Sequence, residues 1–314
     1  MSVTALWEAL QEQSGRVIVG LDDAMQLVTI ALFSGGHVLV EGVPGTGKTL
    51  LVKTLARLIQ GEFKRLQFTP DLMPSDIVGT SVFDLATNEF RARRGPIFAN
   101  IVLTDEINRA PPKTQSALLE AMEECQVTID GTSHPLPEPF MVAATQNPLE
   151  YEGTYPLPEA QLDRFQFKVL VDYRNASDEE EVLRRHRSGS TPEAVSADLQ
   201  PVLTPESVME GRRSAELVRV DDSVISYATA IARASRQSPD LHLGASPRAS
   251  IAVMRGARVR ALMQGRDFVI PDDVKALVPP AYRHRIQLKA EAEIQGVSPD
   301  EAVARILDSV EVPR

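Results

Sequence analysis

Five short apolar runs in the first 175 residues alternate with amphipathic segments. Several runs are apolar at consecutive positions, which is typical of strands buried on both faces of a parallel sheet. Between them, residues 49–61 place Leu51, Leu55 and Leu58 on one helix face, and residues 113–124 repeat this pattern. This alternation predicts a three-layer α/β sandwich with a parallel sheet. The predicted strands are residues 37–42, 64–69, 100–106, 140–147 and 165–171.

After residue 175 the pattern is helical. Residues 177–186 predict a helix with a capping box from Ser177 to Glu180, and the polar stretch 188–201 predicts a linker. Further helices are predicted at 221–235, 246–263, 271–286 and 298–310. We therefore expect an α/β core at 1–175, a connecting helix and linker at 176–200, and a small all-α domain at 201–314.

Composition narrows the class of protein. The chain has 314 residues and a net charge of −10, and its first 175 residues hold 14 basic and 22 acidic side chains. This balance argues against broad nucleic-acid binding, which needs a basic face. Cys125 is the only cysteine, which fits a reducing, cytoplasmic setting. The N-terminus lacks the basic start of a signal peptide, and the apolar run at 27–33 is too short for membrane insertion.

A phosphate-binding loop is predicted at "GVPGTGKT", residues 42–49, directly between a strand and a helix. Its glycines let backbone N–H groups face one centre, beside the positive end of the helix. Lys48 is expected to reach the β- and γ-phosphates, and Thr49 to offer its hydroxyl to Mg²⁺. The predicted nucleotide-binding residues are Gly42, Val43, Pro44, Gly45, Thr46, Gly47, Lys48, Thr49 and Leu50.

Two strands end in polar side chains that belong beside this loop. The run at 101–106 ends in Asp105 and Glu106, and carboxyl ends of parallel strands share one edge of a sheet. Asp105 is expected to bind Mg²⁺ and also to contact the nucleotide, and Glu106 to activate the attacking water. Asn147 ends the next strand, where it either hydrogen-bonds the γ-phosphate or the attacking water, or starts a turn with Pro148.

The ordered motifs resemble those of AAA+ ATPases, and more narrowly those of the MoxR family. They are "GGHVLVEGVPGTGKT", "FTPDLMPSDIVG", "RRGPIFANIVLTDEINRAPPKTQSALLEAM", "EGTYPLPEAQLDRF" and "GASPRAS". The resemblance implies a P-loop AAA+ sandwich followed by a helical lid, with inserts at about 72–97 and 125–139. It implies that Val19 and Gly20 line the adenine, although family members usually carry Gly-Gln where this chain has Gly20-Leu21.

The resemblance also assigns roles to three polar residues. Asn147 matches the sensor 1 position, Arg248 the sensor 2 arginine on the lid, and Arg164 the arginine finger that acts on a neighbouring subunit. Arg248 is expected to stabilise the transferring phosphoryl group together with Lys48, Asn147 and a neighbour's Arg164. A cation in the first turn of a helix opposes the helix dipole, which favours a phosphate-binding role for Arg248. The alternatives are a solvent-facing Arg248 and an intramolecular ion pair for Arg164.

Several functions are compatible with these motifs. The first is Mg²⁺-dependent ATP hydrolysis by a homo-oligomer, implied to be a hexameric ring, that remodels or activates partner proteins. The resemblance implies partners with a von Willebrand factor A domain. The alternatives are an ATPase subunit of a metal chelatase, a nucleic-acid translocase, and a non-hydrolysing scaffold switched by nucleotide. The acidic core argues against the translocase, and the presence of Glu106 and Arg164 argues against the scaffold.

Overall fold

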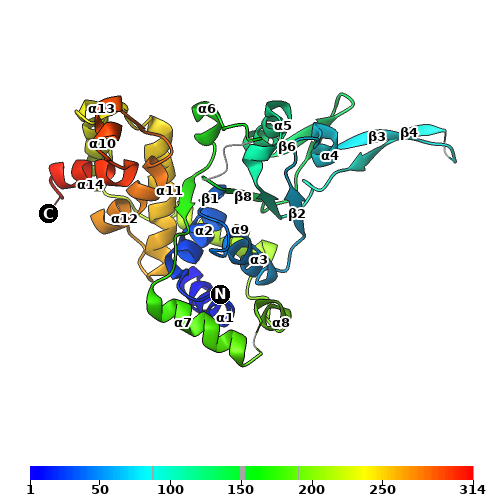
Figure 1. Cartoon of the computed structure of the whole chain (residues 1–314), viewed down its shortest axis with the longest axis horizontal. Helices are drawn as coiled ribbons and strands as arrows, with labels where there is room; N and C mark the ends of the chain where they lie inside the picture. The colour runs from blue at the N-terminus through cyan, green and yellow to red at the C-terminus, as the bar shows by residue number, and fades with distance from the viewer. Residues whose placement is uncertain (87, 149–152, 190, 314) are drawn as a thin grey trace.

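The computed structural model describes the chain except for residues 87, 149–152, 190 and 314 and the side chain of residue 193. Its central sheet has the strand order β2-β5-β8-β1-β9, and every pair of neighbours is parallel (Figure 1). All five predicted strands are confirmed. Their bounds are β1 Val38–Glu41, β2 Phe63–Gln67, β5 Ile101–Asp105, β8 Met141–Gln146 and β9 Phe167–Leu170.

Consecutive apolar positions in the strands serve two different cores. Ile101 and Leu103 of β5 belong to the core under helices α1 (Val3–Gly15), α2 (Asp22–Ser34) and α3 (Lys48–Arg57). Val102, between them, belongs to the core under α4 (Pro74–Val78) and α5 (Pro112–Glu124). Because successive side chains of a strand point to opposite faces, a run without alternation means that helices cover both faces. The three-layer sandwich is thus confirmed.

Two hairpins interrupt this sandwich. β3 (Gly79–Asp84) and β4 (Glu89–Arg94) form an antiparallel pair that projects away from the rest of the molecule (Figure 1). β6 (Gln126–Ile129) and β7 (Thr132–Pro135) form the second pair. Asp130 and Gly131 connect them with positive φ angles of 51° and 79°. This is the backbone that an Asp-Gly hairpin turn requires.

The C-terminal part is mainly helical, as expected, with several local corrections. The helix α7 (Ala176–Arg187) is capped by the side chain of Asn175, which accepts a hydrogen bond from the Asp178 N–H, so the predicted Ser177 capping box is wrong. The expected linker at 188–201 contains α8 (Pro192–Ala197). The remaining elements are α9 Pro205–Glu216, α10 Asp222–Gln237, β10 Leu241–Leu243, α11 Pro247–Met263, α12 Pro271–Tyr282, β11 Gln287–Leu288, α13 Ala290–Ile294 and α14 Pro299–Ser309.

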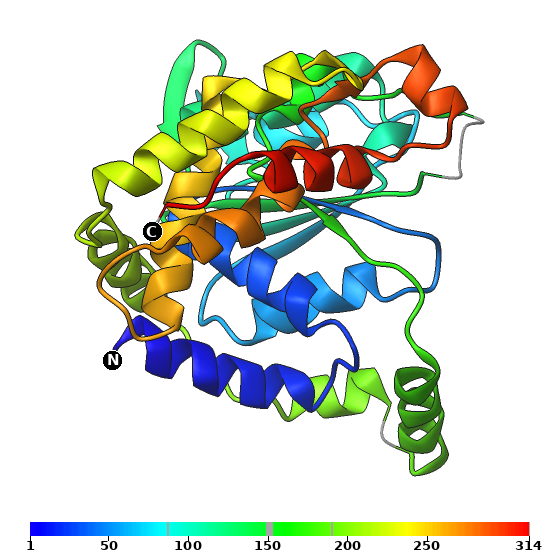
Figure 2. The same ribbon diagram turned by 90° about the vertical axis from the view of Figure 1, so that its left-hand side faces the viewer.

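The helical part packs directly on the sandwich and shares a core with it (Figure 2). Helix α11 contacts α1, α2, α9 and α12. Its Gly256 lies so close to Phe167 of β9 that an added Cβ would come within 2.8 Å of the phenyl ring. This position therefore brings the helix backbone onto the edge strand of the sheet, and it fixes the place of the residues at both ends of α11.

Candidate functional site

The predicted phosphate loop connects the carboxyl end of β1 to the first residue of α3. Gly47 caps α3 with a φ of 97°, a left-handed conformation that side chains disfavour. At Gly42 an added Cβ would lie 2.1 Å from the carbonyl oxygen of Val171. The chain therefore needs glycine at both positions to make the curve that presents backbone N–H groups at the helix N-terminus.

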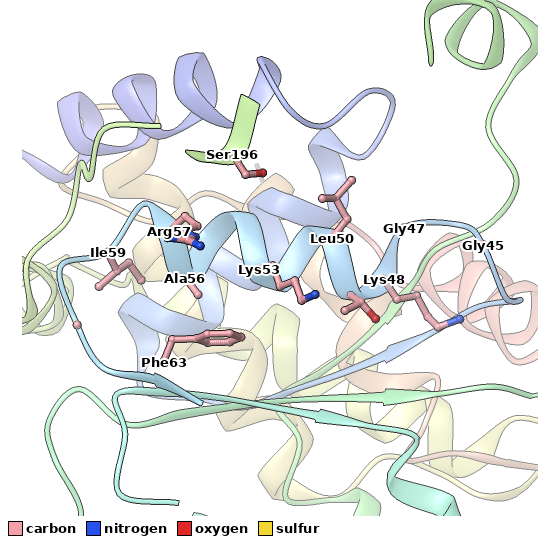
Figure 3. Close-up of a pocket in the computed structure, with 12 residues that line it drawn as sticks. Gly45, Gly47, Lys48, Leu50, Lys53, Ala56, Arg57, Ile59, Phe63 and Ser196 are labelled. Atoms are coloured by element: carbon pink, nitrogen blue, oxygen red, sulfur yellow. The ribbon is translucent and has the colours of Figure 1, made fainter. Parts of the chain in front are cut away.

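The lysine of the loop lies inside this curve. Lys48 Nζ donates hydrogen bonds to the carbonyl oxygens of Gly42 (2.5 Å) and Val43 (2.8 Å). A pocket of about 890 Å³ begins here and runs along α3 to Phe63 (Figure 3). It contains the phosphate end of the expected site, whereas Val19 and Gly20 lie outside its lining. The ammonium group is thus at the place where phosphate oxygens would meet the loop.

The carboxylate at the end of β5 is buried and fully engaged. Asp105 Oδ1 accepts hydrogen bonds from the hydroxyls of Thr49 and Thr145, both at 3.1 Å. Asp105 Oδ2 accepts one from Arg65 Nε at 2.6 Å. Neither Arg65 nor Thr145 was predicted as a site residue; they lie one strand away on either side, in β2 and β8.

The Thr49 and Asp105 oxygens suit Mg²⁺. This ion is usually held through one or two carboxylates together with hydroxyl, water and phosphate oxygens. Within the described ranges, no cluster of three or more His, Cys, Asp or Glu residues could hold a metal by itself. A divalent ion at Thr49 and Asp105 would consequently depend on nucleotide phosphates for its remaining ligands.

Glu106 turns away from the strand that ends at Asp105. Its φ of 57° and ψ of 53° are left-handed, an uncommon conformation for this residue type that often marks functional sites. Its backbone N–H donates to Thr145 Oγ1 at 3.0 Å. Its Oε2 accepts hydrogen bonds from Gln67 Nε2 (3.0 Å) and Arg109 Nη1 (3.2 Å). The carboxylate is therefore held at the same edge as the loop, by two residues that sequence analysis did not select.

Asn147 and the Val19-Gly20 segment also lie at this edge. Asn147 is buried and follows β8, the strand between β5 and β1. Val19 accepts a hydrogen bond at its carbonyl oxygen from Arg174 Nε at 2.7 Å. A Cβ added to Gly47 would lie 2.9 Å from Arg174 Nη2, so this guanidinium stands between Val19 and the phosphate loop. Arg174 is a further cation of the site that no sequence motif marks.

The two predicted arginines lie at the opposite edge of the sheet. Arg164 Nε is 3.4 Å from Glu123 Oε2, and Arg248 Nη2 is 2.6 Å from Glu123 Oε1. Arg248 Nη1 is also 3.6 Å from Asp163 Oδ2. Together with His37 they line a cleft of about 480 Å³.

Within one chain, the length of a strand separates the two arginines from the phosphate loop. Arg164 precedes the amino end of β9, whereas the phosphate loop follows the carboxyl end of the neighbouring parallel strand β1. A four-residue strand is about 13 Å long, which separates the two edges. Arg248 shares its carboxylate partner Glu123 with Arg164, so within this chain it stands apart from Lys48, and its contact with phosphate stays a prediction.

His37, at the amino end of β1, completes the arginine edge. Its Nδ1 accepts a hydrogen bond from the Val142 N–H at 3.0 Å, and its Nε2 donates to the Met122 carbonyl at 3.1 Å. Complete burial lowers the pKa of His37 to about 4, against the opposing effect of the Met122 hydrogen bond. The ring is thus neutral near pH 7 and holds β1, β8 and α5 together.

Comparison with known proteins agrees with this geometry. Residues 37–167 match the family described as "ATPase family associated with various cellular activities (AAA)", and residues 233–306 match the AAA lid domain. With a phosphate loop, an acidic strand end and a helical lid, the chain is an ATPase of the AAA+ class that binds nucleotide.

Similarity to individual proteins identifies the family within this class. Chaperone MoxR1 of Mycobacterium tuberculosis (strain ATCC 25618 / H37Rv) is 44% identical over 95% of this chain and 80% of its own length. Protein YeaC of Bacillus subtilis (strain 168) is 50% identical over 96% of this chain and 93% of its own. A crystal structure of a candidate ATPase from Cytophaga hutchinsonii ATCC 33406 has a TM-score of 0.89 at 39% identity, covering 99% of this chain and 96% of that one. The chain belongs to the MoxR family of AAA+ ATPases.

Proposed function

We propose that this protein hydrolyses ATP with Mg²⁺ at the interface between two copies of the chain, within a homo-oligomeric ring. The observation that carries the proposal is the division of charged residues between two edges of one sheet. Lys48 and Glu106 belong to the edge of the phosphate loop, and Arg164 and Arg248 belong to the other. A ring brings the arginine edge of one copy against the nucleotide edge of the next.

Within one chain, the side chains at the phosphate-loop edge bind the nucleotide and activate the attacking water. Thr49 and Asp105 would hold Mg²⁺, which when bound neutralises charge on the β- and γ-phosphates. Lys48 exchanges its contacts with the loop carbonyls for phosphate oxygens. Glu106 takes the proton of the attacking water, and Asn147 donates a hydrogen bond that orients this water or the γ-phosphate.

The hydrogen bonds around Glu106 set a condition for this chemistry. In the described structure its Oε2 accepts from both Gln67 and Arg109. These two donors occupy the oxygen that would otherwise be open to the attacking water. We infer that productive geometry requires Glu106 to release at least one of these partners when nucleotide and the neighbouring chain are in place.

The neighbouring chain supplies the cations that stabilise the transition state. Arg164 and Arg248 both contact Glu123, whose side chain is 37% exposed, so their guanidinium groups meet at an open cleft. Charge on the transferring phosphoryl group is spread over its oxygens, and an arginine provided in trans raises turnover by about 10³–10⁵-fold. The resemblance to ring-forming relatives favours six copies.

We further propose that hydrolysis drives chaperone-like remodelling or activation of partner proteins, including proteins with a von Willebrand factor A domain. A relative named as a chaperone, with 44% identity, supports this activity. The β3–β4 hairpin offers a surface for a partner, because Phe83 and Phe90 form an edge-to-face pair that is 41% and 69% exposed. Such exposed aromatic side chains often mark protein interaction sites.

A dilution series tests the interface proposal. ATP turnover per chain is measured from nanomolar to micromolar protein, with the mass of the assembly followed by light scattering or mass photometry in the same samples. Turnover per chain should fall in parallel with the fraction of assembled protein. Full turnover in samples that contain only single chains would overturn the proposal.

A further inference from the structure

Arg285, just beyond the end of α12, makes an unusual set of contacts for one side chain. Its Nε donates to Asp163 Oδ1 at 2.5 Å, and its Nη2 donates to the carbonyl oxygens of Asp163 (2.9 Å) and Phe165 (2.6 Å). Its Nη1 donates to the carbonyl oxygens of Gln166 (3.0 Å) and Ala281 (2.6 Å). The side chain is only 3% exposed. The five N–H groups of the guanidinium thus all donate to protein oxygens.

Four of these five acceptors belong to the segment that carries Arg164. The guanidinium of Arg285 contacts the backbone before Arg164, at Asp163, and the backbone after it, at Phe165 and Gln166. Arg164 itself directs its side chain to Glu123 at the cleft. A planar guanidinium that bonds several fixed carbonyls restrains their relative positions, so Arg285 fixes the backbone on both sides of Arg164.

Asp163 extends this arrangement to the second arginine of the cleft. Its Oδ1 accepts from Arg285, and its Oδ2 lies 3.6 Å from Arg248. Burial lowers the pKa of Arg285, and the Asp163 carboxylate opposes that effect by stabilising the cation. One carboxylate therefore links the end of α12, the start of α11 and the segment that carries Arg164.

A second, half-buried arginine near the end of α12 makes a different set of contacts. Arg283, two residues before Arg285, donates from Nε to Asp300 Oδ1 at 3.0 Å and from Nη1 to the Lys168 carbonyl oxygen at 3.2 Å. Its side chain is 14% exposed. Arg283 thus joins the end of α12 to α14 and β9, and among the described residues it makes no hydrogen bond to residues 163–166, which makes it a matched control.

We propose that Arg285 is a positioning residue that sets the place of Arg164 and, through Asp163, of Arg248. The position of the helical lid in one chain then determines how well that chain serves the nucleotide site of its neighbour. This inference rests on the proposed function, in which Arg164 acts on the neighbouring chain. It adds that lid and arginine edge move as one unit, so hydrolysis in one site depends on the lid of the next chain.

The test compares Arg285→Lys with Arg283→Lys in the full-length protein. Lysine keeps the positive charge, but its single ammonium group cannot bond Asp163, Phe165 and Gln166 together. Arg285→Lys is expected to lower kcat by at least about tenfold, with the affinity for a fluorescent ADP analogue within about twofold of the unchanged protein. Arg283→Lys is expected to lower the melting temperature while kcat stays within about twofold.

Two further measurements separate positioning from general destabilisation. If Arg285 acts through Arg164 and Arg248, the loss of kcat in the double variant Arg164→Ala/Arg285→Lys is smaller than the product of the two single losses. Mixing Arg285→Lys chains with Glu106→Gln chains should also restore hydrolysis, because the Glu106→Gln chains present a correctly placed Arg164. Additive losses in the double variant, or a loss that mixing does not restore, would overturn the inference.

A third variant, Asp163→Asn, tests the inference if Arg285→Lys does not fold. Asp163→Asn keeps the side-chain shape and removes the charge that both Arg285 and Arg248 face, and it is expected to lower kcat in the same direction. Unchanged kcat in Asp163→Asn would overturn the inference in that case. The proposed function fails separately, if Arg164→Ala alone keeps its full kcat.

Discussion

The parallel sheet has two functional edges: the carboxyl edge, which holds the phosphate loop, and the amino edge, which holds Arg164 and Arg248. The side chains at these two edges are positioned in different ways. At the carboxyl edge, Thr49, Asp105 and Glu106 are placed by short strand-to-helix connections and contact groups on neighbouring strands. At the amino edge, Arg164 and Arg248 meet only because α11 and α12 of the lid pack against the sandwich. In the proposed mechanism, nucleotide binding is therefore a local property of one chain. Transition-state stabilisation, by contrast, depends on lid packing and on a second chain.

The largest expected effect is on the amino edge. Arg164→Ala should lower ATP turnover by about 10³–10⁵-fold, because a cation that stabilises the transferring phosphoryl group is lost. The affinity for a fluorescent ADP analogue should remain within about twofold, since the carboxyl edge is intact. Arg184→Ala is the control, because among the described residues Arg184 forms ion pairs only with Glu180 and Glu181, on the surface of α7. A parallel loss of affinity in Arg164→Ala would place Arg164 at its own phosphate loop.

The corresponding change at the carboxyl edge is Glu106→Gln. Loss of the general base should lower turnover by about 10²–10⁴-fold while ATP binding persists. Phosphate release and retention of radiolabelled ATP on the purified protein measure the two properties separately. Turnover at the ordinary rate would remove Glu106 from its proposed role and leave the carboxyl edge without a base.

Acid should destabilise the fold, because His37 and His284 are buried at the amino edge. His284 Nε2 bonds the Phe165 carbonyl, and burial lowers its pKa well below the ordinary value of 6.5. The pKa of His37 is lowered to about 4. Between pH 6.5 and 4 the unfolded chain binds a proton at His37 that the folded chain does not, so the free energy of unfolding falls as pH falls.

For His37 alone the loss reaches about 3 kcal/mol at pH 4, because each unit of pKa difference contributes 1.36 kcal/mol. Urea unfolding at a series of pH values measures this slope. His37→Asn should lower stability at pH 7 and flatten the slope between pH 6.5 and 4. An unchanged slope in the variant would show that His37 does not titrate with unfolding.

The smallest of these effects concerns Arg174 at the carboxyl edge. Arg174→Ala should weaken nucleotide affinity about tenfold, because a guanidinium beside Val19 and Gly47 is placed to contact bound nucleotide. Arg174→Lys should recover part of the affinity. Turnover at saturating ATP should change by less than about threefold. Equal affinities for all three proteins would limit Arg174 to a structural contact with Val19.

The carboxyl edge could be predicted from the sequence better than the amino edge. The loop at 42–49 and the Asp105-Glu106 pair were predictable, because each motif forms within one strand and the turn that follows it. The five strands were predictable because continuous apolar runs require cover on both faces. The hydrogen bonds of Glu106 to Gln67 and of Asp105 to Arg65 were not, since they join different strands through side chains that no motif marks.

The amino edge was predicted least well. Arg164 and Arg248 could be selected by resemblance, but their common partner Glu123 is 125 residues from Arg248 along the chain. Only the packing of α11 brings them together, and no periodicity in the sequence reports that packing. For the same reason, the role of Arg285 could not be predicted. In the sequence "YRHRI" it looks like an ordinary surface cation, but its side chain is 3% exposed in the fold.

The central claim is that the carboxyl edge of one chain works with the amino edge of another. Its most direct test mixes two inactive proteins, Glu106→Gln and Arg164→Ala, and measures ATP turnover at constant total protein. Each interface between an intact Glu106 and a neighbour's intact Arg164 should be active. Random assembly of equal amounts should therefore give up to roughly a quarter of the ordinary rate. Mixtures that assemble normally but remain inactive at every ratio would contradict the claim.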